Sequence, residues 1–348
     1  VEVFIRLIGP GPPVFRPFFS APPAVKSGLS SPALATAMAR ARYHGVVREM
    51  PGQLMTEQQV LERLRRRLPP GGKALVAGIG DDCAIWRPPE SGEDQIYTTD
   101  FLIENVHFRR DTHTAADAGH KALARGLSDI AAMGGTPRFC LVSLGLPAWA
   151  DNRWIDGFYR GLLRLAAETG TFLAGGDLAR TEMVVCDVVA GGTVPKGKAL
   201  RRDHARPGQA IYVSGVLGGS ALGLETRRGA AWKRHVRPSP RLSLGRYLRA
   251  ELRAAAAMDL SDGLSADLRR LCLESGVAAV IDRPLPVFPG ASLDQALHGG
   301  EDYELLFTVG SRTRVPEAFE AIPLTRIGAV TKGPAGAVTF FGAPLAPR

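Results

Sequence analysis

The stretch Ala115-Ala-Asp-Ala-Gly-His-Lys-Ala-Leu-Ala-Arg-Gly-Leu-Ser-Asp-Ile-Ala-Ala-Met133, with Gly134-Gly135 and then Leu141-Val-Ser-Leu-Gly-Leu146, decides the fold class. Its first part favours a helix, and a glycine pair is typical of a helix C-terminus. Its last part is an apolar run of strand length. A helix followed directly by a strand is the unit from which α/β proteins are built.

The same alternation continues on both sides of this stretch. Strands are predicted at 74–79, 95–99, 172–174 and 183–194, and helices from Thr56 and at 151–168. Beyond a linker at 201–208, strands are predicted at 210–214, 278–282, 303–309 and 326–330, and helices at 220–227, 239–251 and 262–274. We therefore predict an α/β (α+β, two-domain) protein, with an N-terminal sheet domain at 55–200 and a C-terminal α/β domain at 201–348. The tail from Thr331 is rich in Gly and Pro and is predicted to be weakly structured.

Residues 1–54 differ in composition from the rest of the chain. They are rich in Pro from Pro10 to Pro32, then in Ala and Arg, and show no helical or strand period. Such a segment buries too little apolar surface to offset its ordering entropy. We predict a disordered leader or a mis-assigned start. A targeting signal is the alternative, because acid-poor leaders with Arg are typical of organelle transit peptides.

Composition excludes several classes of protein. Of the 348 residues, 45% are apolar and 22% are charged, which excludes wholesale disorder. The sequence contains no run of 18 apolar residues, so no membrane span is predicted. Its four cysteines are scattered and form no CxxC pair, which argues against a disulfide scaffold or a zinc site. Residues 1–54 carry +4 of the net charge of +9, which weakens a nucleic-acid interpretation. We predict a cytoplasmic protein with no membrane or nucleic-acid partner.

A recurrent unit places small residues before an aspartate at a strand end or a helix start. It occurs at Gly80-Asp81-Asp82, Thr98-Thr99-Asp100, Leu127-Ser128-Asp129, Gly175-Gly176-Asp177 and Asp259-Leu260-Ser261-Asp262. Each alone is explained by a turn or a helix cap. Together, carboxylates on such loops can converge on one crevice of an α/β fold. Carboxylates without Cys or clustered His favour Mg²⁺ and hence ATP-dependent chemistry.

The standard nucleotide-binding motifs are not matched. The segment Gly192 to Ala199 approaches the P-loop pattern, but Ala199 lacks the hydroxyl that would bind Mg²⁺. The segment Gly215 to Ser220 follows a predicted strand and opens a helix, so its N–H groups could receive an anion. Close packing of the helix on the strand is the alternative use of these glycines.

Two further positions carry both a structural and a functional interpretation. His107 follows the Asp100 turn and lies beside apolar residues, where a single histidine is usually structural. Glu301 follows Gly299-Gly300 at the start of a predicted strand, where a solvated turn is the alternative.

Seven segments occur together in the order found in one family. The chain from about Met55 to Lys332 resembles the thiamine-monophosphate kinase family, of the superfamily that includes aminoimidazole ribonucleotide synthetase. The segments are Gly78–Ala84, Thr98–Asp100 with Glu104–Phe108, Lys121–Gly134, Gly175–Asp177, Arg234–Arg241, Met258–Leu264 and Gly299–Leu305.

This resemblance implies the family's fold and direct transfer of the ATP γ-phosphoryl group to thiamine phosphate, the last step of thiamine diphosphate synthesis. It implies several Mg²⁺ ions, ATP as co-substrate, and a homodimer formed through the N-terminal sheets. The implied metal ligands are Asp82, Thr98, Thr99, Asp100, Asp129, Asp177, Asp259 and Asp262. The implied ATP contacts are Tyr159, Gly176, Asp177, Arg202 and Ser261, and His107 and Glu301 would face thiamine phosphate. No covalent intermediate is implied, and Asp81 is expected to shape its turn.

The chain departs from the family pattern in three places. Leu178-Ala179 stand where hydroxyl residues are common before the arginine, the C-terminus lacks an aromatic tail over the thiamine rings, and the leader has no counterpart. Three alternatives remain: a sister ATP-dependent synthetase, a basic nucleic-acid-binding protein and an inactive relative. The sister enzyme is disfavoured by the segments around His107 and Glu301. Aromatics at 7% disfavour the second, and the intact aspartates disfavour the third.

Overall fold

The computed structural model describes residues 56–68 and 72–347. These residues belong to two units, one ending at Leu68 and one beginning at Pro69, and each is considered by itself. In the first unit, α2 (Glu57–Arg65) begins with the predicted capping box between Thr56 and Gln59. The prediction of a disordered or mis-assigned leader at 1–54 lies outside the described residues.

The second unit begins with a six-stranded sheet of order β1-β2-β3-β6-β4-β5. All neighbours are antiparallel except β4 and β5, which are parallel. Its strands are β1 (Leu75–Ala77), β2 (Ala84–Trp86), β3 (Glu93–Ile103), β4 (Thr136–Leu146), β5 (Phe172–Arg180) and β6 (Val185–Pro195).

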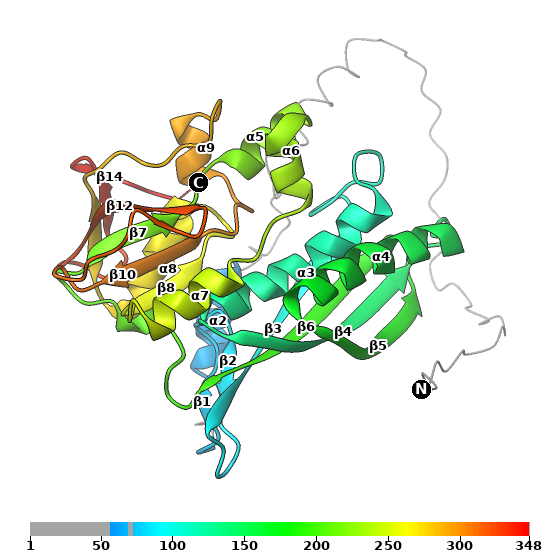
Figure 1. Ribbon diagram of the computed structural model, residues 1–348, viewed down its shortest axis with the longest axis horizontal. Coiled ribbons are helices and arrows are strands. Elements are labelled where there is room, and N and C mark those ends of the chain that lie inside the picture. Colours follow the sequence, from blue (N-terminus) through cyan, green and yellow to red (C-terminus); the bar gives the residue numbers. More distant parts are fainter. Residues whose placement is uncertain (1–55, 69–71, 348) are drawn as a thin grey trace, which may run out of the picture. The chain divides into compact units, whose positions relative to one another are not determined.

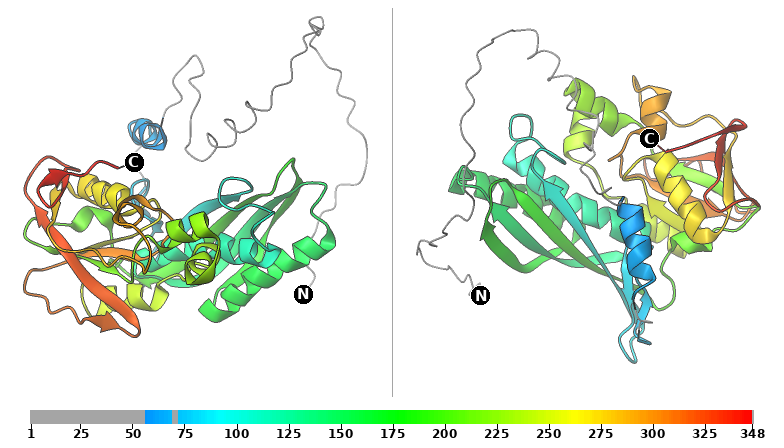
Figure 2. Two further views of the ribbon diagram at one scale, coloured as in Figure 1. Left: turned by 90° about the horizontal axis from the view of Figure 1, so that it is seen from above. Right: turned by 180° about the vertical axis from the view of Figure 1, so that it is seen from behind.

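Two long helices, α3 (Ala115–Ala132) and α4 (Asn152–Thr169), cover one face of this sheet (Figure 1). Figure 2 shows both helices on the same side when the molecule is turned. The predicted helix at 115–133 is confirmed, and Gly134 follows it with a left-handed φ of 67°. The side chains on that face form a core with the helices, so this sheet has one buried face and one open face.

A second sheet follows, of order β14-β13-β9-β12-β7-β10-β8, with β11 paired to β12. Its strands are β7 (Ala210–Ser214), β8 (Ala256–Asp259), β9 (Ala278–Ile281), β10 (Leu305–Val309), β11 (Ala318–Phe319), β12 (Ile322–Thr331), β13 (Val338–Phe340) and β14 (Ala343–Pro344). The helices are α5 (Gly219–Thr226), α6 (Gly229–Val236), α7 (Leu242–Ala250), α8 (Leu264–Ser275) and α9 (Leu293–His298), with a 3₁₀ turn at Arg202–His204.

One core joins the two sheets. It combines Ile96 of the first sheet, Ile130 near the end of α3, Leu248 of α7 and Phe307 of the second sheet. A second core lies between the other face of the second sheet and α8. Helix α3 therefore contacts both sheets, and residues that it exposes between them can reach either one. Among the described residues, no helix is both long and apolar enough to cross a membrane.

Some expected elements differ from those observed. The prediction of a weakly structured tail is wrong at 338–344, where β13 pairs with β9 and with β14. The strand predicted to end before Gly175 continues through the glycines to Arg180, because β5 stays paired with β4 after a register shift between Leu173 and Gly175. There, a Cβ on Gly176 would lie 1.8 Å from the Val142 carbonyl oxygen, so only glycine fits. Helices α6 and α9 and strand β8 were not expected from the sequence. Each is short, and α6 has no side-chain cap.

Candidate active site

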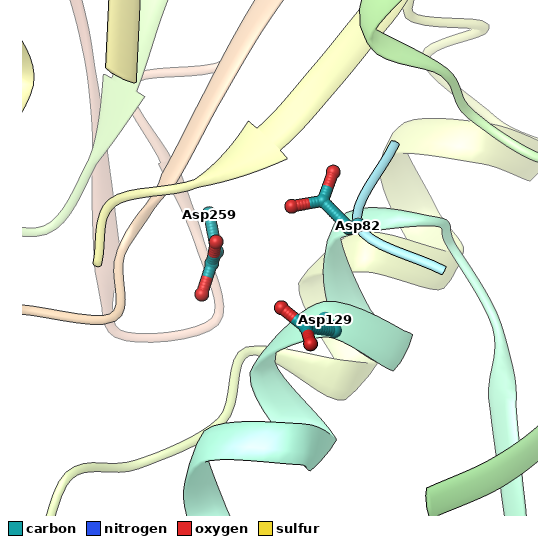
Figure 3. Close-up of side chains that lie close together, drawn as sticks. All are labelled: Asp82, Asp129 and Asp259. Atoms are coloured by element: carbon teal, nitrogen blue, oxygen red, sulfur yellow. The ribbon is translucent and has the colours of Figure 1, made fainter. Parts of the chain in front are cut away.

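Three of the predicted metal ligands meet in space. Asp82 lies in the turn before β2, Asp129 on α3 and Asp259 at the end of β8 (Figure 3). Each offers a carboxylate oxygen, and these oxygens all lie within 4.8 Å of one another. Asp82 and Asp259 are buried and Asp129 is half-buried. The recurrent aspartates at 82, 129 and 259 therefore form one carboxylate cluster.

Hydroxyl groups orient two of these carboxylates. Thr98 Oγ1, on β3, donates to Asp129 Oδ2, and Ser128 Oγ donates to Asp259 Oδ2 at 2.7 Å. Burial raises the pKa values of Asp129 and Asp259 well above the usual range, and repulsion from neighbouring carboxylates raises them further. A cation among the three groups would remove that repulsion, and carboxylate oxygens suit a hard ion such as Mg²⁺. The residues present thus fit the predicted metal.

Arginines pair with three aspartates of the predicted site, one of them in the carboxylate cluster. Arg202 binds Asp82 through two bonds, Nη2 to Oδ1 at 2.6 Å and Nε to Oδ2 at 3.1 Å. Asp100 accepts from Arg125 Nη2 at 3.0 Å and is close enough to raise the pKa of Asp129.

Asp262, whose side chain is about half exposed, pairs with Arg270 of α8. Together, Asp82, Asp100 and Asp262 each have a guanidinium partner, which offsets the negative charge of the site.

Two of the predicted metal ligands lie on the other face of the first sheet. Because side chains alternate along β3, Thr98 faces α3 while Thr99 faces the open side, where it donates to Asp187 of β6. Asp177 also lies there and lines a pocket with Phe101 and Asp187. The structure does not bring Thr99 and Asp177 to the carboxylate cluster of the same chain.

The remaining predicted ATP contacts are spread along the unit. Gly176 lies beside Asp177 in β5, and Tyr159 packs against Phe158 and the core between α4 and the first sheet. Ser261 lies in the turn after β8, where its carbonyl oxygen accepts the Glu301 N–H at 2.7 Å. Of this set, Ser261 and Arg202 are hydrogen-bonded to other predicted site residues, Glu301 and Asp82 respectively.

The two residues predicted to face thiamine phosphate share one partner. Lys121 Nζ on α3 donates to Glu301 Oε2 and to the His107 carbonyl oxygen, both at 2.9 Å. Burial, with the positive charges of Arg125 and Lys121, lowers the pKa of His107 to about 4, so its ring is neutral. Burial alone would raise the pKa of Glu301, but the positive charges of Lys121 and Arg125 lower it below its usual value. His107 and Glu301 therefore belong to one site.

Sequence reasoning missed Lys121, Arg125 and Ser128 as site residues. A signal was available, because these polar residues recur at spacings of four and three on a helix whose other buried residues are nearly all apolar or glycine. That spacing puts them on one face of α3, together with Asp129.

The expected anion site at Gly215–Ser220 is filled from within the chain. Asp302 accepts hydrogen bonds from the N–H groups of Gly218 and Ser220. Of the two uses considered for these glycines, binding of an external anion is thus not the one observed, because an internal carboxylate takes that place. The near P-loop segment forms the end of β6 and a turn in which Gly197 donates to Asp94.

Comparisons with known proteins agree with this geometry. The family models for the N-terminal and C-terminal domains of AIR synthase related proteins match residues 80–194 and 206–340. The thiamine-monophosphate kinase of Escherichia coli (strain K12) is 40% identical over 278 residues, which cover 73% of this chain and 84% of that protein. The chain belongs to the thiamine-monophosphate kinase family.

Solved structures of thiamine-monophosphate kinases share this fold. One from Stenotrophomonas maltophilia K279a is 38% identical, with a TM-score of 0.67 over 81% of this chain and 95% of that one. A second, described as AaThiL complexed with AMPPCP and TMP, is 29% identical, with a TM-score of 0.72 over 84% of this chain and 99% of that one. The predicted two-part α/β fold of the family is thus confirmed. The boundary near residue 200 stays a prediction.

Proposed function

We propose that this chain transfers the γ-phosphoryl group of ATP to thiamine phosphate, giving thiamine diphosphate and ADP. The observation that carries this proposal is the cluster of Asp82, Asp129 and Asp259. The same helix, α3, carries both Asp129 of this cluster and Lys121, which binds the residues proposed for thiamine phosphate, His107 and Glu301. The proposal is supported by the kinship with thiamine-monophosphate kinases, one of which is described with an ATP analogue and TMP bound.

Mg²⁺ fits the carboxylate cluster, and Asp82, Asp129 and Asp259 are the residues that would hold it. When bound, Mg²⁺ offsets the negative charge of the phosphates that must approach one another. Thr98 and Ser128 keep the carboxylates of Asp129 and Asp259 oriented toward that place. We keep Asp100 and Asp262 in the proposed metal set; their partners Arg125 and Arg270 would then be free to bind phosphate oxygens.

The reaction needs positioning and charge neutralisation from the protein, and no covalent intermediate. The attacking group is a phosphate oxygen of thiamine phosphate, which is already an anion near neutral pH, so no side chain has to remove a proton. We assign Arg202, which is hydrogen-bonded to Asp82, to the ATP phosphates. The assignment of Tyr159, Gly176 and Ser261 to ATP remains part of this proposal.

We also propose a homodimer that uses the open face of the first sheet. This face exposes Trp86, Phe101 and Leu141 by 44%, 55% and 38%, and exposed apolar side chains on one sheet face favour association. Thr99 and Asp177 lie on the same face. Their proposed role as metal or ATP ligands therefore depends on the partner subunit that would cover this face. The cytoplasm stays the proposed location, in keeping with four unpaired, buried cysteines.

The proposed function is tested with the full chain, ATP, MgCl₂ and thiamine phosphate, with thiamine diphosphate followed by chromatography. Parallel reactions replace thiamine phosphate by thiamine or replace MgCl₂ by EDTA. We expect thiamine diphosphate only when ATP, Mg²⁺ and thiamine phosphate are all present. Binding of ATP without formation of thiamine diphosphate would move the chain to a sister reaction of the superfamily.

A further inference from the structure

Lys121 is one of the large side chains that are fully buried among the described residues, with an exposed fraction of 0%. Lysine is almost never fully buried unless its charge is paired. Burial lowers the pKa of Lys121, and the neighbouring Glu301 carboxylate opposes that effect. A charged side chain at position 121 therefore has a desolvation cost that an apolar residue would not have.

The ammonium group of Lys121 joins two segments that are far apart in the sequence. It donates to the main-chain carbonyl oxygen of His107, in the loop after β3, and to Glu301 Oε2, before β10, both at 2.9 Å. His107 therefore lies on a loop of the first sheet, and Glu301 lies next to a strand of the second sheet. Lys121, on α3 between them, holds both at once.

The backbone of the segment that carries Glu301 is strained. Glu301 and Tyr303 both have left-handed φ values, 65° and 50°, which non-glycine residues rarely adopt. The Asp302 side chain binds the start of α5, and the Glu301 N–H binds the Ser261 carbonyl oxygen. Backbone strain of this kind persists only where the surroundings enforce it, and it is common at binding sites.

Exposure separates the two partners. The Glu301 side chain is 21% exposed, whereas that of Lys121 is fully covered. Glu301 can therefore touch a ligand and Lys121 cannot. His107 Nδ1 accepts the Ile103 N–H at 3.0 Å, so the neutral ring carries its proton on Nε2. The site thus offers one carboxylate and one N–H donor, which suit the cationic thiazolium ring and an acceptor atom of thiamine phosphate.

We propose that Lys121 is the positioning residue of the acceptor site, because its ammonium group fixes the Glu301 carboxylate and the His107 main chain in the geometry that binds thiamine phosphate. This inference rests on the proposed function and deepens it. Lys121 acts through Glu301 and His107 and does not itself contact ATP or the transferred phosphoryl group.

The test compares Lys121→Met, Glu301→Gln and the double variant in the full chain. KM and kcat are measured for thiamine phosphate and for ATP, and the Kd of each is measured by calorimetry. Lys121→Met should raise KM and Kd for thiamine phosphate about tenfold or more, as expected for loss of a charge-assisted hydrogen bond. The ATP constants should stay within about twofold. In the Glu301→Gln background, Lys121→Met should raise KM for thiamine phosphate by a smaller factor than in the unaltered chain, because only the contact of Lys121 with His107 is then left to lose.

The matched control is Arg87→Met. Arg87 pairs with the buried Asp94 at 2.6 Å within the first sheet, so this variant also breaks an ion pair with a buried carboxylate. It should lower Tm without changing the constants for thiamine phosphate. If Lys121→Met does not fold, Lys121→Gln carries the same comparison, because it removes the charge but keeps an N–H donor.

Three outcomes would overturn the inference. One is a lower Tm for the Lys121 variant with an unchanged KM for thiamine phosphate. Another is an equal loss of affinity for ATP and for thiamine phosphate in the Lys121 variant. The third is that Lys121→Met weakens binding of thiamine phosphate by the same factor with and without Glu301→Gln. Failure of the proposed function is recognised separately, because the unaltered chain would then neither bind nor phosphorylate thiamine phosphate.

Discussion

Asp82, Asp129 and Asp259 place three carboxylates within 4.8 Å of one another. Burial and mutual repulsion raise the pKa values of Asp129 and Asp259, which means that their charged forms destabilise the folded chain. A cation reverses this effect by pairing with the charges. The residues that serve the proposed metal site therefore reduce stability when no metal is bound, which is common at functional sites.

We predict that Asp129→Asn stabilises the metal-free protein and abolishes its activity. Asparagine keeps an acceptor for Thr98 but removes one of three repelling charges. In EDTA, Tm should rise by about 2–4 °C, corresponding to about 1 kcal/mol for a domain of this size. With Mg²⁺, kcat/KM should fall by about 100-fold or more, as for loss of a key electrostatic group. Thermal scans and initial rates measure the two effects.

The control for this substitution is Asp111→Asn, which removes an aspartate whose side chain is 56% exposed and paired with Arg109. Exposed ion pairs contribute little to stability, so Tm and kcat/KM should both be nearly unchanged. An Asp129→Asn variant that keeps normal turnover would remove Asp129 from the metal site.

Buried histidines predict a pH dependence of stability. Burial lowers the pKa values of His113 and His235 to about 4 and about 3, so both are neutral when folded and bind protons on unfolding. Below the unfolded pKa of about 6.5, the unfolded state binds more protons, and the stability due to these groups is lost as pH falls toward their folded pKa values. Buried carboxyl groups such as Asp267, with a pKa raised to about 7, act in the opposite direction.

His113→Phe isolates one histidine from these opposing contributions. His113 lies among Phe108, Trp232 and His235, and its buried Nε2 has no hydrogen-bond partner among the described residues. When the pH falls from 7.5 to 5.5, the unfolding free energy of the variant should rise by about 1 kcal/mol relative to that of the unaltered chain, because the variant has no histidine at 113 to take up a proton on unfolding. Urea unfolding at both pH values measures this difference. The exposed His204→Gln is the control, and an equal gain there would contradict the assignment.

At the scale of elements, α3 positions the site. One face of this helix carries Lys121, Arg125, Ser128 and Asp129, while its other side packs against α4. Glycines let the two helices approach closely, since a Cβ on Gly161 of α4 would lie 1.9 Å from the Ala116 carbonyl oxygen. The position of the polar face therefore depends on this close packing.

Gly161→Ala should destabilise the protein although alanine is the better helix former. The added Cβ meets main-chain atoms that cannot move alone, so the two helices must separate, at a cost of about 1–3 kcal/mol. Chemical denaturation measures the loss. Gly92→Ala, where no atom lies within 4 Å of the added Cβ, should change stability by less than about 0.5 kcal/mol. Equal effects at the two positions would contradict the packing argument.

At the scale of the whole second unit, the site and the proposed dimer use opposite faces of the first sheet. The carboxylate cluster lies on the side of α3, and Phe101 and Leu141 lie on the open side. Substitutions on the open face therefore test association without touching Asp82, Asp129 or Asp259.

We predict that Phe101→Asp and Leu141→Asp convert the dimer into a monomer. Sedimentation should give about twice the chain mass of 37.1 kDa for the unaltered protein and a single mass for either variant. A charge buried in an apolar interface is unfavourable, which drives the dissociation. Leu163→Asp on α4, 45% exposed, is the matched control and should remain dimeric. A monomeric unaltered chain would exclude this dimer.

The amino-acid sequence by itself was enough to predict the order of most helices and strands and the family to which the chain belongs. Helices at 115–133 and 151–168 were predictable because their caps, glycine stops and apolar spacing are local. Strand β8 and helices α6 and α9 were not, because each is short and is stabilised by neighbours distant in sequence. The pairing of β13 with β9 was unpredictable for the same reason.

Within the site, the sequence determined which residue types are present, and tertiary structure decided which of them meet. Recurrent aspartates pointed to a metal, but only the packing of two sheets on α3 brings Asp82, Asp129 and Asp259 together and leaves Asp177 on the opposite face. Likewise, helical spacing places Lys121 on the same face of α3 as Arg125, but only the tertiary structure brings its ammonium group to His107 and Glu301. The physical reason is that local patterns specify periodicity and caps, whereas convergence of charges depends on contacts across more than a hundred residues of chain.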